Sequence, residues 1–105
     1  NLNTMDLTQE QWKEKLAQTD KAVILDVRTA QEVAEGKIEG AIHHDIFNPQ
    51  AFMAAVDTFD PSVSYFVYCR SGNRSGQACA VLRSKGIENA FNLIGGVMSW
   101  DGPLV

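Results

Sequence analysis

The fold follows from residues 65–75, which read YFVYCRSGNRS. The first four residues are aromatic or β-branched, which is the composition of a buried strand. Gly72 and Asn73 tolerate the positive φ angles of a tight loop. A helix is expected over residues 75–85, with apolar residues on one face and Gly86 as its C-terminal cap. The stretch therefore predicts a central strand, a loop and a helix in direct succession.

The rest of the chain repeats this alternation. Strands are predicted where short apolar runs occur, at residues 22–25, 41–43 and 91–94. Helices are predicted from cap signals and apolar spacing at residues 8–18, 29–36, 49–56 and 96–100.

Strict alternation of strands and helices indicates an α/β fold. Right-handed crossovers then give three layers, α/β/α, around a small, mainly parallel central sheet of about five strands. Ligands of such sheets bind beyond the carboxyl ends of the strands. We therefore expect the site in the loops after Leu25, Tyr68 and Leu93.

Length and composition indicate one soluble domain spanning residues 1–105. The net charge of −4 disfavours nucleic-acid and membrane-surface partners, which require positive charge. No apolar run approaches the roughly 18 residues of a membrane span, and no secretory signal is visible. We expect a cytoplasmic protein. Because the chain begins at Asn1 rather than Met, a removed leader would instead place it in the periplasm or outside the cell.

The loop after the central strand carries the chemistry. Backbone N–H groups at a helix N-terminus form a cradle for an anion, and we expect this cradle to consist of Ser71, Gly72, Asn73 and Ser75. Cys69 would lie at its base, where the helix N-terminus and nearby arginines lower the pKa of a thiol and favour the nucleophilic thiolate.

Two arginines complete the predicted site. Arg70 and Arg74 are permanent cations whose fork of donors suits an oxyanion. Residues 61–87 contain four basic residues and no acidic one, a local charge of +4 on a chain of −4. A plain surface turn would explain the Gly, Ser and Asn residues, but it would not explain a cysteine with two arginines at a strand–helix junction.

Four motifs in order resemble the single-domain rhodaneses, a sulfurtransferase family. Residues 25–28 (LDVR) with Glu32 resemble the family's first motif, and residues 68–75 its active-site loop. Residues 36–42 resemble its second motif, although Lys37 and Glu39 replace the usual histidine and proline. Gly95-Gly96 with Trp100 resembles its C-terminal motif.

The resemblance implies a double displacement through Cys69. Its thiolate would take the outer sulfur of a small anionic donor such as thiosulfate, and Arg70 and Arg74 would hold the leaving sulfite. A thiol or cyanide would then accept the sulfur from the persulfide. A protein is a further candidate acceptor, and no metal or organic cofactor is called for.

Two other functions remain open. The first is a persulfide carrier that moves sulfur between proteins and uses free thiosulfate poorly. The second is a cysteine-dependent phosphatase, whose cradle has its arginine six positions after the cysteine. Here Arg74 lies five positions after Cys69, and Tyr68 stands where phosphatases usually have histidine. The shorter loop favours sulfur substrates, as the resemblance implies.

The remaining candidate residues have plainer interpretations. Asp26 and Arg28 end the first buried strand, where they contact substrate or, as we favour, support the loops beneath the site. Cys79 lies among alanines on a helix, so we favour a buried structural role over that of a resolving thiol. His43 and His44 are adjacent on a strand, point to opposite faces and chelate poorly together, so no metal site is predicted.

Overall fold

A five-stranded parallel sheet forms the centre of the computed structural model, which describes residues 5–105. The strands lie in the order β1-β5-β4-β2-β3, and every neighbouring pair is parallel. They comprise β1 (Asp6–Leu7), β2 (Ala22–Asp26), β3 (Ile42–His43), β4 (Ser64–Tyr68) and β5 (Ala90–Leu93). The predicted fold class is confirmed.

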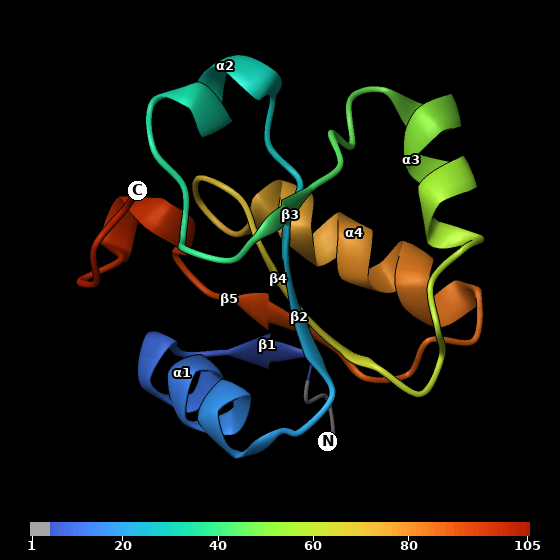
Figure 1. Cartoon of the computed structure of the whole chain (residues 1–105), viewed down its shortest axis with the longest axis horizontal. Helices are drawn as coiled ribbons and strands as arrows, with labels where there is room; N and C mark the ends of the chain where they lie inside the picture. The colour runs from blue at the N-terminus through green and yellow to red at the C-terminus, as the bar shows by residue number, and fades with distance from the viewer. Residues whose placement is uncertain (1–4) are drawn as a thin grey trace.

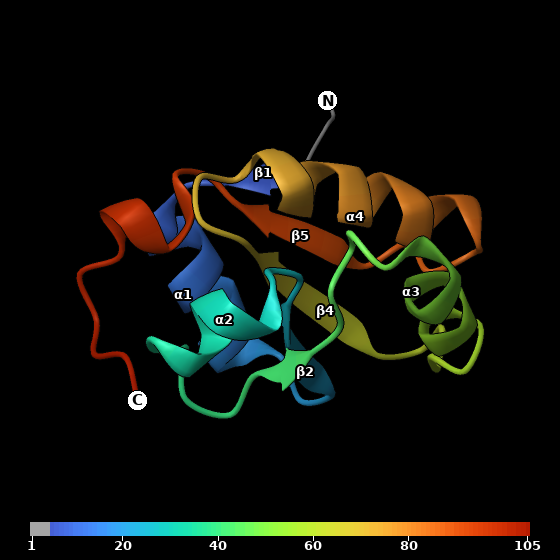
Figure 2. The same ribbon diagram turned by 90° about the horizontal axis from the view of Figure 1, so that it is seen from above.

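Helices cover both faces of this sheet (Figure 1). Figure 2 shows α3 and α4 on one side and α1 on the other. The helices are α1 (Gln9–Gln18), α2 (Ala30–Ala34), α3 (Pro49–Val56), α4 (Asn73–Ser84) and the 3₁₀ helix η1 (Gly96–Ser99). Thr8 and Thr29 cap α1 and α2 through complete capping boxes, and Pro49 opens α3. The caps and the proline start are as predicted, whereas at Thr8 only an N-cap was expected and the full box is a finding of the structure.

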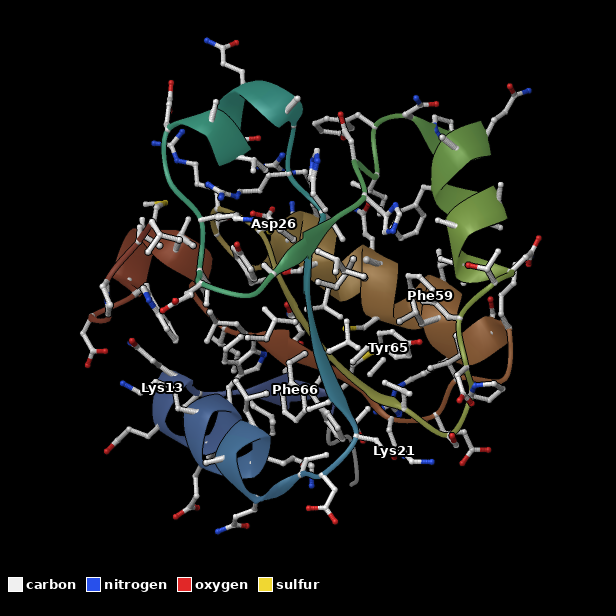
Figure 3. All side chains as sticks on the ribbon, viewed as in Figure 1. Lys13, Lys21, Asp26, Phe59, Tyr65 and Phe66 are labelled. Carbon is white, nitrogen blue, oxygen red and sulfur yellow. The ribbon has the colours of Figure 1, made fainter. Side chains whose placement is uncertain are left out.

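The alternation of side chains along β4 divides the core in two. Tyr65, Val67 and Cys69 point to the layer of α3 and α4, whereas Phe66 and Tyr68 point to that of α1. Figure 3 shows Tyr65 beside Phe59 on the first side and Phe66 near α1 on the second. Because β4 lies between β5 and β2, all of these side chains are buried. The same alternation directs the sulfur of Cys69 toward the start of α4.

The strand register brings three loops to one edge of the sheet. Asp26 pairs with Tyr68, and Val67 pairs with Asn92, so β2, β4 and β5 end at similar heights. Figure 3 shows Asp26 at the carboxyl end of β2, with Lys21 beside the other end of the strand. Loops that are far apart in sequence therefore meet at this edge, as the parallel fold predicts.

Three elements differ from the sequence-based expectation. Strand β1 was not predicted, because two residues are too few for an alternation to be recognised. Helix α4 begins at Asn73 rather than Ser75, because Gly72 takes a left-handed conformation (φ +100°) and starts the helix itself. The closing helix at Gly96 is 3₁₀. No helix among residues 5–105 is long and apolar enough to cross a membrane.

Candidate active site

The loop from Cys69 to Ser75 closes over the Cys69 sulfur. The backbone N–H groups of Gly72 and Ser75 donate to Sγ over 3.1 and 3.4 Å, and the Ser75 hydroxyl lies 3.3 Å from it. These groups belong to the N-terminal turn of α4, whose dipole also favours an anion there. Of the four residues expected to form the cradle, Gly72 and Ser75 direct their amides at the sulfur.

This environment favours the thiolate of Cys69. Burial raises the pKa of the thiol, but the hydrogen bonds from Ser75, Gly72 and Ser71 outweigh that effect, so the pKa lies below its ordinary value. By contrast, Cys79 is buried without such donors, and burial raises its pKa to about 12. Cys79 therefore remains a neutral thiol in the core, in line with the structural role favoured for it.

The Cys69 side chain has no solvent-exposed surface. It packs beneath its own loop, in the same apolar cluster as Ala78 and Cys79. A small molecule therefore reaches Sγ only if part of the loop moves aside. Ser71 on the loop and Asn73 at the start of α4 are exposed, and their side chains make no hydrogen bond to the sulfur.

Arg74 is held by a partner from another element. Its guanidinium donates two hydrogen bonds to the Glu32 carboxylate of α2, over 2.8 and 3.0 Å, and lies 5.3 Å from the centre of the Phe47 ring. These bonds lower the pKa of Glu32 to about 2. Glu32 also forms the capping box with Thr29. The charge of Arg74 is therefore largely neutralised by Glu32, which the sequence spacing of 42 residues did not reveal.

Arg70 has a different environment. It is exposed and forms no ion pair within residues 5–105. It lines a cleft of about 380 Å³ together with Arg28, Glu35 and Met98. Of the two loop arginines, Arg70 is therefore the one whose donors remain available to an anion.

Asp26 and Arg28 form a buried ion pair beneath the site. Arg28 Nη2 donates to Asp26 Oδ2 (2.7 Å) and to the carbonyl oxygen of Gly36 (2.7 Å). Tyr68 donates its hydroxyl to Asp26 (2.6 Å) and accepts from the N–H of Ile38 (3.0 Å). Burial and the bond to Asp26 raise the pKa of Tyr68, so it remains a neutral donor. The contacts support the loop at residues 36–38, and the sequence analysis did not assign Tyr68 this function.

The segment after β5 is hydrogen-bonded to the backbone of the active-site loop. Val97 and Met98 donate their N–H groups to the carbonyl oxygens of Cys69 and Arg70, over 3.0 and 2.9 Å. A Cβ atom at Gly96 would collide with the backbone of these two residues, which explains the glycine.

His43 and His44 do not build a site with other ligands. His43 Nε2 lies 2.7 Å from the carbonyl oxygen of Arg28, and His44 packs against Phe59. Within residues 5–105, no three His, Cys, Asp or Glu side chains gather where they could hold a metal ion.

The sequence of this chain is similar to a known protein family and to known sulfurtransferases. The rhodanese-like domain model matches residues 8–102. The chain is 34% identical over 95 residues to a sulfurtransferase of Allochromatium vinosum, covering 90% of this chain and 86% of that one. It is 33% identical over 86 residues to thiosulfate sulfurtransferase GlpE of Actinobacillus succinogenes, covering 82% and 75%.

A solved structure agrees with these matches. The crystal structure of a rhodanese-like domain protein from Staphylococcus aureus superimposes with a TM-score of 0.80 at 30% identity, covering 95% of each chain. The family match, the similarity to sulfurtransferases and the shared fold together show that this chain belongs to the rhodanese-like domain family.

Proposed function

We propose that the chain acts as a single-domain sulfurtransferase that carries sulfur as a persulfide on Cys69. The observation that supports this most strongly is the set of donors from Gly72 and Ser75 around Sγ at the start of α4. Donors in this position stabilise negative charge on sulfur, both in the thiolate and in the persulfide. The similarity to sulfurtransferases supports the same class of reaction.

The first half-reaction is a displacement at sulfur. The Cys69 thiolate attacks the outer sulfur of thiosulfate, a new S–S bond forms, and the original S–S bond breaks. Sulfite leaves with the electron pair of that bond, and the persulfide anion remains on the enzyme. Charge is conserved, because one thiolate and one dianion become one persulfide anion and one dianion.

The second half-reaction returns the enzyme to its starting state. An acceptor such as cyanide attacks the outer persulfide sulfur, the S–S bond breaks toward Sγ, and thiocyanate and the thiolate result. An acceptor thiol reacts in the same way as its thiolate. Ping-pong kinetics are expected, since the first product leaves before the acceptor binds.

The two loop arginines take different parts in this proposal. Arg70, exposed beside the loop and without an ion pair in residues 5–105, binds the oxyanion of the donor. Arg74 acts through Glu32, which fixes the guanidinium against α2. Ser71, Gly72, Asn73 and Ser75 supply backbone amides, while Asp26 and Arg28 support the site from below.

Mass spectrometry tests the carrier residue. After incubation with thiosulfate, the wild-type chain is expected to gain about 32 Da, one sulfur atom, and Cys69→Ser is expected to gain nothing. The matched control is Cys79→Ser, because Cys79 is buried without donors and should leave the adduct intact. An adduct that persists in Cys69→Ser would overturn the proposal.

A persulfide carrier between proteins is the second candidate function. It is favoured by the burial of Cys69 and by Phe47 and Met98, two large apolar side chains that are each 67% exposed near the site. A thiosulfate:cyanide assay separates the two functions. Rapid turnover supports the enzyme, whereas a Cys69 that loads with sulfur but turns over poorly supports the carrier.

A further inference from the structure

A buried amide connects the active-site loop to the edge of the sheet. Asn92 lies on β5, and its side chain points to the same face as Cys69 and α4. Its Nδ2 donates to Asp6 Oδ1 of β1 (2.8 Å) and to the carbonyl oxygen of Gly72 (3.1 Å). Its Oδ1 accepts from the hydroxyl of Ser75 over 2.5 Å.

The orientation of this amide is determined by its neighbours. The Asp6 carboxylate and the Gly72 carbonyl can only accept hydrogen bonds, so the NH₂ group of Asn92 has to face them. The amide oxygen is thereby directed at Ser75. A flipped amide would place oxygen against two acceptors and NH₂ against a hydroxyl, and would lose two bonds.

Ser75 has one hydroxyl hydrogen and two neighbouring acceptors. Asn92 Oδ1 is 2.5 Å from Ser75 Oγ, and Cys69 Sγ is 3.3 Å from it. A single hydrogen cannot fully serve both. While Cys69 is a neutral thiol, the hydrogen bonds to Asn92, and the S–H can donate to the Ser75 oxygen.

We propose that Asn92 is a positioning residue that competes with the Cys69 sulfur anion for the hydrogen of the Ser75 hydroxyl. When Cys69 loses its proton to solvent, the hydroxyl rotates toward sulfur and the amide oxygen of Asn92 loses its donor. No covalent bond to Ser75 changes in this step. Asn92 therefore makes the thiolate less favourable than it would be with Ser75 wholly available.

Other charged groups also lie on the elements around Cys69. Arg74 of α4 is paired with Glu32, Arg28 is paired with Asp26, and Arg70 is exposed on the loop. Asp6 of β1 lies behind Asn92. Cys79 of α4, with its pKa raised to about 12 by burial, is neutral across the titration.

The test is a double-mutant cycle on the pKa of Cys69. The four proteins are the reference chain, Asn92→Leu, Ser75→Ala and the double variant, all with Cys79→Ala so that one thiol remains. The ultraviolet absorbance of the thiolate gives the pKa of each. Both proteins that carry Asn92→Leu lose the hydrogen bonds from Asn92 to Gly72 and Asp6. The effect of that loss on the pKa of Cys69 is therefore subtracted when the two backgrounds are compared.

The expected coupling has a definite sign. With Ser75 present, Asn92→Leu should lower the pKa of Cys69 more than it does in the Ser75→Ala background. The difference between the two effects should be about three- to tenfold in the ionisation constant. A coupling of zero, or one of the opposite sign, would overturn the competition.

A second measurement uses the chain with Asn92 in place. The ¹³C resonance of the Asn92 side-chain carbonyl should shift during the titration, with the same midpoint as the Cβ of Cys69, and the shift should vanish in Ser75→Ala. A carbonyl that does not respond in the unsubstituted chain contradicts the inference. This inference rests on the proposed nucleophile, yet both readouts are independent of sulfur transfer, so a failed transfer assay would leave them interpretable.

Discussion

At the scale of single residues, the active-site loop separates two arginines that look equivalent in sequence. Arg74 is bound by Glu32 through two hydrogen bonds, whereas Arg70 is exposed in the cleft beside the loop. The charge presented to a donor is therefore smaller than the local +4 of residues 61–87 suggests. The proposed oxyanion contact consequently depends on one side chain.

Replacement of Arg70 tests this assignment. Arg70→Ala is expected to raise KM for thiosulfate on the order of tenfold, because one charge-assisted contact is lost, with a smaller change in kcat. Arg70→Lys retains the positive charge and should recover part of the loss. Steady-state kinetics measure both, and an unchanged KM in Arg70→Ala would reject the contact.

Ser75 governs the ionisation of Cys69. Its N–H and hydroxyl are among the hydrogen bonds that lower the pKa of the thiol. Ser75→Ala removes the hydroxyl, so the pKa of Cys69 should rise. Less thiolate is then present at a given pH, and the acidic limb of the kcat/KM profile moves to higher pH. Ser84→Ala, on the exposed end of α4, is the control and should leave the profile in place.

At the scale of elements, the Glu32–Arg74 pair connects α2 to α4. The bonds from Arg74 lower the pKa of Glu32 from an ordinary 4.5 to about 2. A carboxyl with a lowered pKa stabilises the fold at pH above its unfolded value, and this contribution is lost as the pH falls toward the folded value. The contribution of Glu32 to the free energy of unfolding is therefore lost between pH 4.5 and about 2.

The corresponding prediction concerns how the free energy of unfolding depends on pH. Glu32→Gln is expected to lower the free energy of unfolding at neutral pH by about 1–2 kcal/mol, since the pair is partly exposed. In that variant, the free energy of unfolding should also fall less steeply between pH 4.5 and 2. Urea unfolding at several pH values measures this, with Glu39→Gln as an exposed control. Equal slopes in the variant and the wild type would contradict the role of the pair.

Most elements were predictable because their signals are local. The capping boxes at Thr8 and Thr29, Pro49 at the start of α3 and the apolar run of β2 each lie within a few residues. Strand β1 has two residues and exists because its backbone pairs with β5, 86 residues away. A strand of that length is created by its partner, so its own sequence carries almost no signal.

At the scale of the whole molecule, Trp12 joins α1, the sheet and the closing helix. Its ring has no exposed surface and makes edge-on contacts with Phe66, Tyr68 and Trp100. Its indole N–H donates to the carbonyl oxygen of Phe91 (3.3 Å). The side chain therefore contributes packing and one buried hydrogen bond to the core beneath β4 and β5.

Truncation of this side chain should weaken the entire fold. Trp12→Ala is expected to lower the free energy of unfolding by about 3–5 kcal/mol, because it leaves a cavity and removes a buried hydrogen bond. Denaturant unfolding measures the change. Phe47→Ala removes an aromatic ring that is 67% exposed, and it should cost less than about 1 kcal/mol. Similar losses in the two variants would contradict this account of the core.

The candidate site, like the fold, combines features set by neighbouring residues in the sequence with contacts between distant residues. Sequence alone determined the strand, the loop and the helix around Cys69, because strand composition, Gly72 and helix spacing act within a few residues. Only the tertiary structure decided that Glu32 neutralises Arg74, that Tyr68 holds Asp26, and that Asn92 reaches Ser75 and Gly72. Those contacts join residues 17 to 42 positions apart through the parallel register of β2, β4 and β5, and a hydrogen bond between distant residues leaves no periodicity in the chain.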